Sequence, residues 1–240
     1  MSDWNPPVAA WREALQRAGA RQRVQFHRTL SHRTRRVYDR LSVVYPASTY
    51  LFHRKAHRLA IELAQIRDGS HVLEIATGSG EMFRRLLREN PQGVTIGLDL
   101  SPKMAAVTQG HVRKEFPRHR AALQAVDVRN MPFADETFDS IVACYLWELL
   151  GTDDVVSSLN EVARVLKPGG RFTTILIGQT SRRFNQAYKV ATQVWPEFWG
   201  RQVAEWVPEE MEESMGFRIE HDQHSQQGFY PSRIIVARKL

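Results

Sequence analysis

A short apolar stretch that runs into a turn of small residues is the clearest chemical signal in the chain. Residues 72–80 read Val-Leu-Glu-Ile-Ala-Thr-Gly-Ser-Gly, and the amphipathic stretch 82–87 follows almost at once. This order predicts a strand, a bend with almost no side chains, and the start of a helix. Such a bend lets a ligand approach the backbone, because no Cβ atom holds it off and glycine tolerates a positive φ. The ligand contacts expected here are Glu74, Ala76, Thr77, Gly78 and Gly80.

Two further acids come after the next two apolar runs. Asp99 ends the run 94–98, and Asp127 follows the run 121–126. A carboxylate at the tip of the second strand can accept hydrogen bonds from both hydroxyls of a ribose. Asp127 could accept from the exocyclic amine of adenine, so the ligand should contain an adenosine. Asp99 could instead cap the next helix, a role that Ser101 fills better. The contacts expected around the nucleoside are Asp99, Leu100, Met104, Asp127 and Val128.

Two acids in the bend decide between a dinucleotide and S-adenosylmethionine. The dinucleotide fingerprint requires a glycine three residues after its second glycine, and that position is Glu81 here. A carboxylate at a helix N-terminus would repel a pyrophosphate in the same place. Glu74 likewise favours a ligand with positive charge. A sulfonium with an α-ammonium group meets this requirement, so the pattern favours S-adenosylmethionine.

The ordered motifs resemble those of class I S-adenosylmethionine-dependent methyltransferases, in the type 11 group that contains the ubiquinone/menaquinone C-methyltransferases. The resemblance is good over residues 70–177. It implies S-adenosylmethionine as cofactor, S-adenosylhomocysteine as product, and further cofactor contacts at Tyr38 and Cys144. Ala76 replaces the first glycine of the usual first motif. The motifs are Glu-Ile-Ala-Thr-Gly-Ser-Gly, Gly-Leu-Asp-Leu-Ser, Asp127 before Met-Pro-Phe, Phe-Asp-Ser-Ile-Val, and Arg-Val-Leu-Lys-Pro-Gly-Gly-Arg-Phe.

The alternation of strands and helices predicts an α/β fold. We expect a Rossmann-like, seven-stranded, mainly parallel sheet with one antiparallel strand, helices on both faces and an N-terminal helical cap. The cap would be basic and span residues 1–66, and the methyltransferase core would span 67–240 with a helical, aromatic insertion at about 180–209. The expected strands lie near 71–75, 94–98, 121–125, 138–144, 171–177, 216–222 and 232–238, and the expected helices near 8–19, 22–43, 48–66, 80–89, 102–115 and 153–166.

Residues beyond the fourth expected strand, in the insertion and in the cap are candidates for an acceptor pocket. Ligands in open α/β sheets bind at the carboxyl ends of the strands. Glu148 could take a proton from an acceptor, or it could be a solvated acid, and no residue is assigned as catalytic. The helical spacing of the insertion favours a helix that packs on the sheet, and the alternative is that its aromatic residues cover the acceptor. The candidates are Tyr50, His53, Tyr145, Trp147, Glu148, Phe198 and Trp199.

His53 and His57 are four residues apart on an expected helix, a spacing compatible with a metal pair. No third ligand accompanies them, so we expect a surface or capping role and no metal site.

Charge is concentrated before the core. The chain of 240 residues carries a formal net charge of +7, whereas residues 21–58 contain nine arginines, Lys55 and a single acid, Asp39, for a local +9. The bases could cover the outer face of a helix. They could also make weak contact with an anionic membrane surface, an acidic substrate or nucleic acid. The single cysteine excludes internal disulfides, and no apolar run is long enough to span a membrane.

We therefore expect methyl transfer, by in-line displacement, to a small apolar, aromatic or quinone-like, or lipid acceptor. The expected location is the cytoplasm, either free or at the membrane periphery, with no specific nucleic-acid partner; the oligomeric state stays open. The alternative is an RNA or protein methyltransferase that uses the basic N-terminal segment. Against it, the fourth strand ends in Ala-Cys-Tyr-Leu, without the Asn/Asp-Pro-Pro-Tyr arrangement used on base amines. A third possibility is a cofactor-binding protein without turnover.

Overall fold

The computed structural model describes residues 53–178, 182–194, 206–228 and 230–240. The expected helices at 8–19 and 22–43 lie outside these residues, as does most of the basic segment 21–58. Four predicted site residues are also outside them: Tyr38, Tyr50, Phe198 and Trp199.

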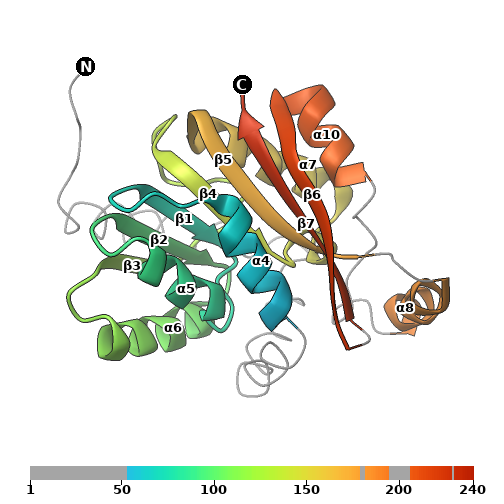
Figure 1. Cartoon of the computed structure of the whole chain (residues 1–240), viewed down its shortest axis with the longest axis horizontal. Helices are drawn as coiled ribbons and strands as arrows, with labels where there is room; N and C mark the ends of the chain where they lie inside the picture. The colour runs from blue at the N-terminus through green and yellow to red at the C-terminus, as the bar shows by residue number, and fades with distance from the viewer. Residues whose placement is uncertain (1–52, 179–181, 195–205, 229) are drawn as a thin grey trace.

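The centre of the molecule is a seven-stranded sheet in the order β3-β2-β1-β4-β5-β7-β6 (Figure 1). The first five strands in this order pair in parallel, and β7 is antiparallel to both of its neighbours. The expectation of a mainly parallel sheet with one antiparallel strand is thus confirmed. The strands are β1 (His71–Ile75), β2 (Val94–Asp99), β3 (Arg120–Ala125), β4 (Phe138–Cys144), β5 (Leu166–Ile177), β6 (Phe217–Gln227) and β7 (Tyr230–Lys239).

Helices cover both faces of the sheet (Figure 1). The first face carries α4 (Arg54–Ala64), α5 (Glu81–Glu89) and α6 (Pro102–Glu115), and the second carries α7 (Thr152–Val165) and α10 (Trp206–Met215). Successive side chains of β1 point to opposite faces of the sheet. Val72 packs with residues of α4 and α5, and Leu73 packs with residues of α7. Glu74 therefore projects to the α4 and α5 side, where a wholly apolar neighbourhood would make an acid costly.

The C-terminal third differs from the sequence expectation in three ways. β5 begins at Leu166, so Lys167–Gly170 belong to the strand, and β6 extends to Gln227. The predicted insertion at about 180–209 contains α8 (Arg182–Val194), and near its end, at Trp206, begins α10, which was not anticipated and runs to Met215. Its signals are weak: Pro208 suits a first helical turn, and Val207 and Met211 are four residues apart and fully buried.

A 3₁₀ turn, η2 (Trp147–Leu149), connects β4 to the segment before α7. None of the described helices is both long and apolar enough to cross a membrane.

Candidate active site

The bend after β1 has the backbone conformation that its small residues suggested. Ala76, Gly78 and Gly80 all have positive φ, at 59°, 50° and 76°. The turn is tied to β2 by a hydrogen bond from the Thr77 amide to the Leu98 carbonyl, at 3.1 Å. A Cβ on Gly80 would lie 2.4 Å from Cγ2 of Thr108. Glycine is favoured at this position, because a positive φ strains other residues and the close approach of Thr108 leaves no room for a Cβ.

Ala76 carries strain at the position where the resembled family has glycine. A left-handed conformation costs an L-residue about 1–2 kcal/mol, and glycine at this position would remove that strain. The same replacement lowers stability by about 0.4–1 kcal/mol, because glycine gives the unfolded chain more conformational freedom. We expect Ala76→Gly to leave the free energy of unfolding unchanged or to raise it by up to about 1 kcal/mol, measured by urea denaturation. Ala163→Gly, inside α7, should lower it by about 1 kcal/mol. An equal loss in both variants would contradict strain at Ala76.

Asp99 holds the bend in place. Its Oδ2 accepts a hydrogen bond from the Gly78 amide at 2.7 Å, and its Oδ1 accepts one from the Ser101 amide at 2.8 Å. The side chain of Ser101 caps α6 by accepting from the Met104 amide, as expected. Carboxylate oxygens accept more than one hydrogen bond each, so Asp99 can fix the bend and bind ribose hydroxyls together.

Glu74 is a buried acid without a hydrogen-bond partner in the described part of the chain. It is 1% exposed, and its Oε2 has no hydrogen-bond partner among the described residues. Burial raises the pKa of Glu74 well above its usual value, and the charge of Asp99 raises it further. Glu74 lines a pocket together with the bend residues Ala76, Thr77 and Gly78. A ligand with positive charge would satisfy this acid, whereas a pyrophosphate would be repelled.

Two histidines of α4 close the same pocket. His53 and His57 both line it and are 9% and 3% exposed, so the expected surface role is wrong. His53 stands at the N-cap position of α4, in line with the capping alternative, but its side chain makes no capping hydrogen bond. Burial lowers the pKa of His53 to about 4 and that of His57 to about 3, and both rings are therefore neutral at physiological pH. Neither ring nitrogen of His57 has a partner among the described residues. The described residues contain no group of three ligands that could hold a metal ion.

Aromatic rings extend from this pocket along the carboxyl end of the sheet. His53 lies 4.2 Å from Tyr145 and 5.0 Å from Tyr230, measured between ring centroids. Tyr230 is 6.3 Å from Phe184, which is stacked on Tyr188 at 5.7 Å. We call these five residues the aromatic arc. They lie at the N-cap of α4, directly after β4, at the start of β7 and on α8, so sequence spacing alone could not group them.

Glu148 lies at the far end of the aromatic arc. It is 2% exposed, which contradicts the alternative of a solvated acid. Its Oε1 accepts a hydrogen bond from the Ile177 amide at 2.6 Å, while its Oε2 has no partner among the described residues. Burial raises the pKa of Glu148 to about 7, against the lowering effect of that hydrogen bond. Tyr188 is near enough for Glu148 to raise its pKa, in addition to the effect of burial.

The structure places the other predicted residues as follows. Trp147 is fully buried, donates from Nε1 to Oγ1 of Thr174 at 2.7 Å and packs edge-on against Phe172. Its assignment to the acceptor pocket is wrong, because the 3₁₀ turn directs the indole into the core. Cys144 lines the pocket. Burial raises the pKa of its thiol, and the charge of Glu74 raises it further.

Asp127 is paired with Arg129, whose Nε lies 2.9 Å from its Oδ1, and Arg129 also binds Asp154 at 2.7 Å. An adenine amine would have to share Asp127 with this guanidinium. Val128, directly after Asp127, and Met104, in α6, are buried, and Leu100 is half-buried in the turn after β2. Their contact with a nucleoside stays a prediction.

The comparisons with known proteins agree with this geometry. A family described as a methyltransferase domain matches residues 72–170. This span contains the bend, Asp99, Asp127 and Glu148. This part of the chain is therefore similar to methyltransferase domains.

Several curated methyltransferases are similar to this domain and its surroundings. The demethylmenaquinone methyltransferase of Symbiobacterium thermophilum is 29% identical over 164 residues, 68% of this chain and 63% of the relative. The ubiquinone/menaquinone biosynthesis C-methyltransferase UbiE of Geobacter sulfurreducens is 29% identical over 168 residues, 66% of this chain. The chain spans less than two thirds of the length of these two relatives, at 63% and 65%. A demethylmenaquinone methyltransferase of Listeria monocytogenes is 27% identical over 206 residues, 84% of its length.

Solved structures share the fold. The putative methyltransferase in complex with the Haloferax volcanii Trm112 activator has a TM-score of 0.68 at 18% identity, covering 84% of this chain and 96% of that one. The [4+2]-cyclase SpnF has a TM-score of 0.64 at 19% identity, covering 77% and 80%. A protein named as a cyclase thus has the same fold as proteins named as methyltransferases, so the acceptor and the reaction have to be argued from the site.

The domain implies S-adenosylmethionine as cofactor, and the residues present fit it. The bend offers a backbone surface without side chains, Asp99 lies beside it, and Glu74 is a buried acid that needs a cationic partner. Glu81, at the start of α5, adds a second carboxylate to the pocket, although Arg84 and Arg85 bind it at 2.7 and 2.9 Å.

Proposed function

We propose that the protein transfers a methyl group from S-adenosylmethionine to a planar aromatic acceptor with an ionisable hydroxyl, such as a quinol. The observation that carries this proposal is the aromatic arc, which joins the pocket at Glu74 to the buried acid Glu148. Flat rings stack favourably on such side chains. A buried acid at the end of an apolar wall suits an acceptor that must lose a proton.

Each end of the cofactor would meet a different group of the pocket. Asp99 would bind the ribose, and the acids of the bend would face the positive charges. His53 and His57 line the pocket on its α4 side, so they would lie beside the cofactor's methionine end. Asp127 would bind adenine only if its carboxylate can accept from the adenine amine while it is paired with Arg129. These roles follow from position and chemistry, and the neighbouring residues Leu100, Met104, Val128 and Cys144 complete the proposed site.

The chain's contribution to the chemistry is positioning and proton transfer. S-adenosylmethionine, when bound, supplies a methyl group already activated by a cationic sulfur. Holding an acceptor in line with that group and excluding water can contribute roughly 7–11 kcal/mol to lowering the barrier. Glu148, with a pKa near 7, would accept the hydroxyl proton of the acceptor and pass it to water. A carbon of the ionised ring would then form the bond to the methyl group, while the sulfur–methyl bond breaks and S-adenosylhomocysteine leaves. The hydrogen on that ring carbon would pass as a proton to the ionised ring oxygen, which restores the aromatic hydroxyl.

The acceptor class draws on the relatives as well as on the arc. The relatives named above act, by their names, on menaquinone and ubiquinone precursors. Such molecules combine a flat ring with an apolar tail. The contact of the basic segment 21–58 with an anionic membrane surface would bring the protein to such acceptors, and it stays a prediction because residues 21–52 lie outside the described part of the chain.

The test is methyl transfer from labelled S-adenosylmethionine to a panel of reduced naphthoquinones, benzoquinones and simple naphthols. We expect label in the ring of at least one quinol and none in RNA or protein. Label that enters only RNA or protein would contradict the proposal and support the alternative.

A pair of α8 variants locates the acceptor. Phe184→Ala removes a ring of the aromatic arc and should raise the KM for the quinol about tenfold or more, while the Kd for S-adenosylmethionine stays unchanged. Val190→Ala changes a side chain of the same helix that is 60% exposed, and should alter neither value. Weaker cofactor binding in Phe184→Ala alone would place the arc in the cofactor site instead.

A further inference from the structure

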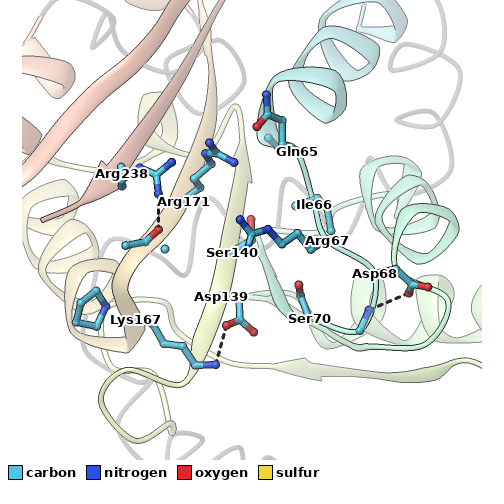
Figure 2. A pocket seen from close by; sticks show the side chains of 15 residues that line it. Gln65, Ile66, Arg67, Asp68, Ser70, Asp139, Ser140, Lys167, Arg171 and Arg238 are labelled. Carbon is cyan, nitrogen blue, oxygen red and sulfur yellow. Dashed lines mark hydrogen bonds and ion pairs between the residues drawn. The ribbon is translucent and has the colours of Figure 1, made fainter.

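A groove lies at the amino ends of the parallel strands, on the opposite edge of the sheet from the bend and the aromatic arc. Figure 2 shows the side chains that line it. The cavity volume is about 490 Å³. Its walls are the loop 65–70 after α4, the first residues of β4 and β5, and the end of β7. No part of the proposed methyl-transfer site lines this groove.

Four cations surround the groove: Arg67, Lys167, Arg171 and Arg238. Lys167 is balanced by Asp139, with Nζ 2.7 Å from Oδ1. Arg171 and Arg238 share a single carboxylate, Glu220, which binds both through their Nε atoms, the former at 2.7 Å. One acid thus serves two guanidinium groups, and a positive charge remains.

Glu220 also orients these two arginines. Because each is bound through Nε, the terminal nitrogens of Arg171 have no protein partner among the described residues, and Arg238 uses only Nη1, toward the Gly169 carbonyl at 3.2 Å. Two guanidinium groups held in this way lose little conformational entropy when they bind an anion. Glu220 is itself held ionised, because its hydrogen bonds to the two arginines outweigh the effect of burial and lower its pKa.

Two further groups lack partners in the groove. The Arg67 guanidinium makes no hydrogen bond or ion pair to any described residue, and Figure 2 shows it directed from its loop toward β4. Ser140, on β4, is 5% exposed, and its hydroxyl has no partner among the described residues. A buried hydroxyl without a partner costs stability, and a bound acceptor oxygen would remove that cost.

We propose that this groove binds a phosphoryl or pyrophosphoryl group of a small molecule. Guanidinium groups match phosphate oxygens in geometry and charge, and a hydroxyl donor completes the set. The volume exceeds the needs of one phosphate and leaves room for an organic body. The inference does not depend on the proposed methyl transfer.

Inorganic pyrophosphate is the probe, titrated calorimetrically into the full chain at constant ionic strength. We expect saturable binding of one equivalent, with the same affinity in the presence of saturating S-adenosylhomocysteine, because the two sites lie on opposite edges. No saturable heat would overturn the proposal. Competition with S-adenosylhomocysteine would also overturn it, since the anion would then occupy the cofactor bend. Citrate that binds more tightly than pyrophosphate would overturn the phosphoryl assignment.

Arg67→Ala is the decisive variant, because Arg67 has no described structural contact to lose. It should weaken pyrophosphate binding about tenfold or more. Arg113→Ala removes an exposed arginine of α6 outside the groove and is the matched control, with affinity unchanged. Equal affinities in the two variants would mean general charge attraction and would contradict a built site.

Ser140→Ala separates binding from folding. It should weaken pyrophosphate binding several-fold, while the unfolding midpoint stays the same or rises, because a buried hydroxyl without a partner is removed. Unchanged affinity would exclude Ser140 from the site, and with it the geometry proposed here.

Discussion

Glu148→Gln should lower kcat for the quinol acceptor about 10²–10⁴-fold, with little change in the Kd for S-adenosylmethionine. A positioned base typically contributes a factor of this size, and glutamine cannot accept the proton. The amide keeps an oxygen that can accept from the Ile177 amide, so the local geometry is retained. Initial rates with labelled methyl donor give kcat directly. A variant with normal kcat would exclude Glu148 as the proton acceptor.

The pH dependence gives a second signature of the same group. Because burial raises the pKa of Glu148 to about 7, the wild-type rate should rise with pH and level off above about 7, whereas residual activity of Glu148→Gln should lack this step. The free energy of unfolding should change with pH in the opposite direction. With its folded pKa above the ordinary value of 4.5, the folded state binds the proton more tightly, so stability falls as pH rises from about 4.5 through about 7. Glu148→Gln should therefore be at least as stable as wild type at pH 8, and a lost rate at that pH cannot come from unfolding.

Asp99→Asn should weaken S-adenosylmethionine binding by about 10²-fold or more, measured as Kd by calorimetry. Both carboxylate oxygens accept from backbone amides, at Gly78 and Ser101, and an asparagine places an NH₂ group against one of these donors. Hydrogen bonds to charged groups contribute about 1.5–3 kcal/mol each, and the variant loses the charge toward both the bend and the ribose.

Asp135→Asn is the matched control. Asp135 is 75% exposed at its side chain and pairs with Arg164 at 2.8 Å, away from the bend. Such a surface ion pair contributes little, so its loss should leave cofactor affinity unchanged. Equal Kd values for Asp99→Asn and Asp135→Asn would contradict a role for Asp99 in binding the cofactor.

The sheet and the cofactor end of the site could be predicted from the sequence because their signals are local. Glu74, the bend and the run before Asp99 lie on consecutive strands, and parallel strands bring their carboxyl ends to one edge. The Ser101 cap could be predicted for the same reason, since it depends on a bond to Met104, three residues away. Local pattern and tertiary structure agree throughout this region.

The acceptor end could not be predicted in the same way. Whether Trp147 and Glu148 face the pocket or the core depends on a 3₁₀ turn, which has no clear sequence signal. The partners that decide it, Thr174 and Ile177, are about 30 residues away along the chain. The burial of His57 depends on how α4 packs on the sheet, because helical spacing gives the face of a helix but not its neighbour. The phosphate groove combines a loop with the first residues of two strands and the end of a third, and no motif marks it.

The central claim is that the bend, Asp99 and Glu74 bind a cationic sulfur nucleoside, and titration of the wild-type protein tests it most directly. S-adenosylmethionine, S-adenosylhomocysteine and NAD should be compared in one calorimetric series. We expect saturable one-to-one binding of the first two and no binding of NAD. Binding of NAD, or no heat with either sulfur nucleoside, would contradict it.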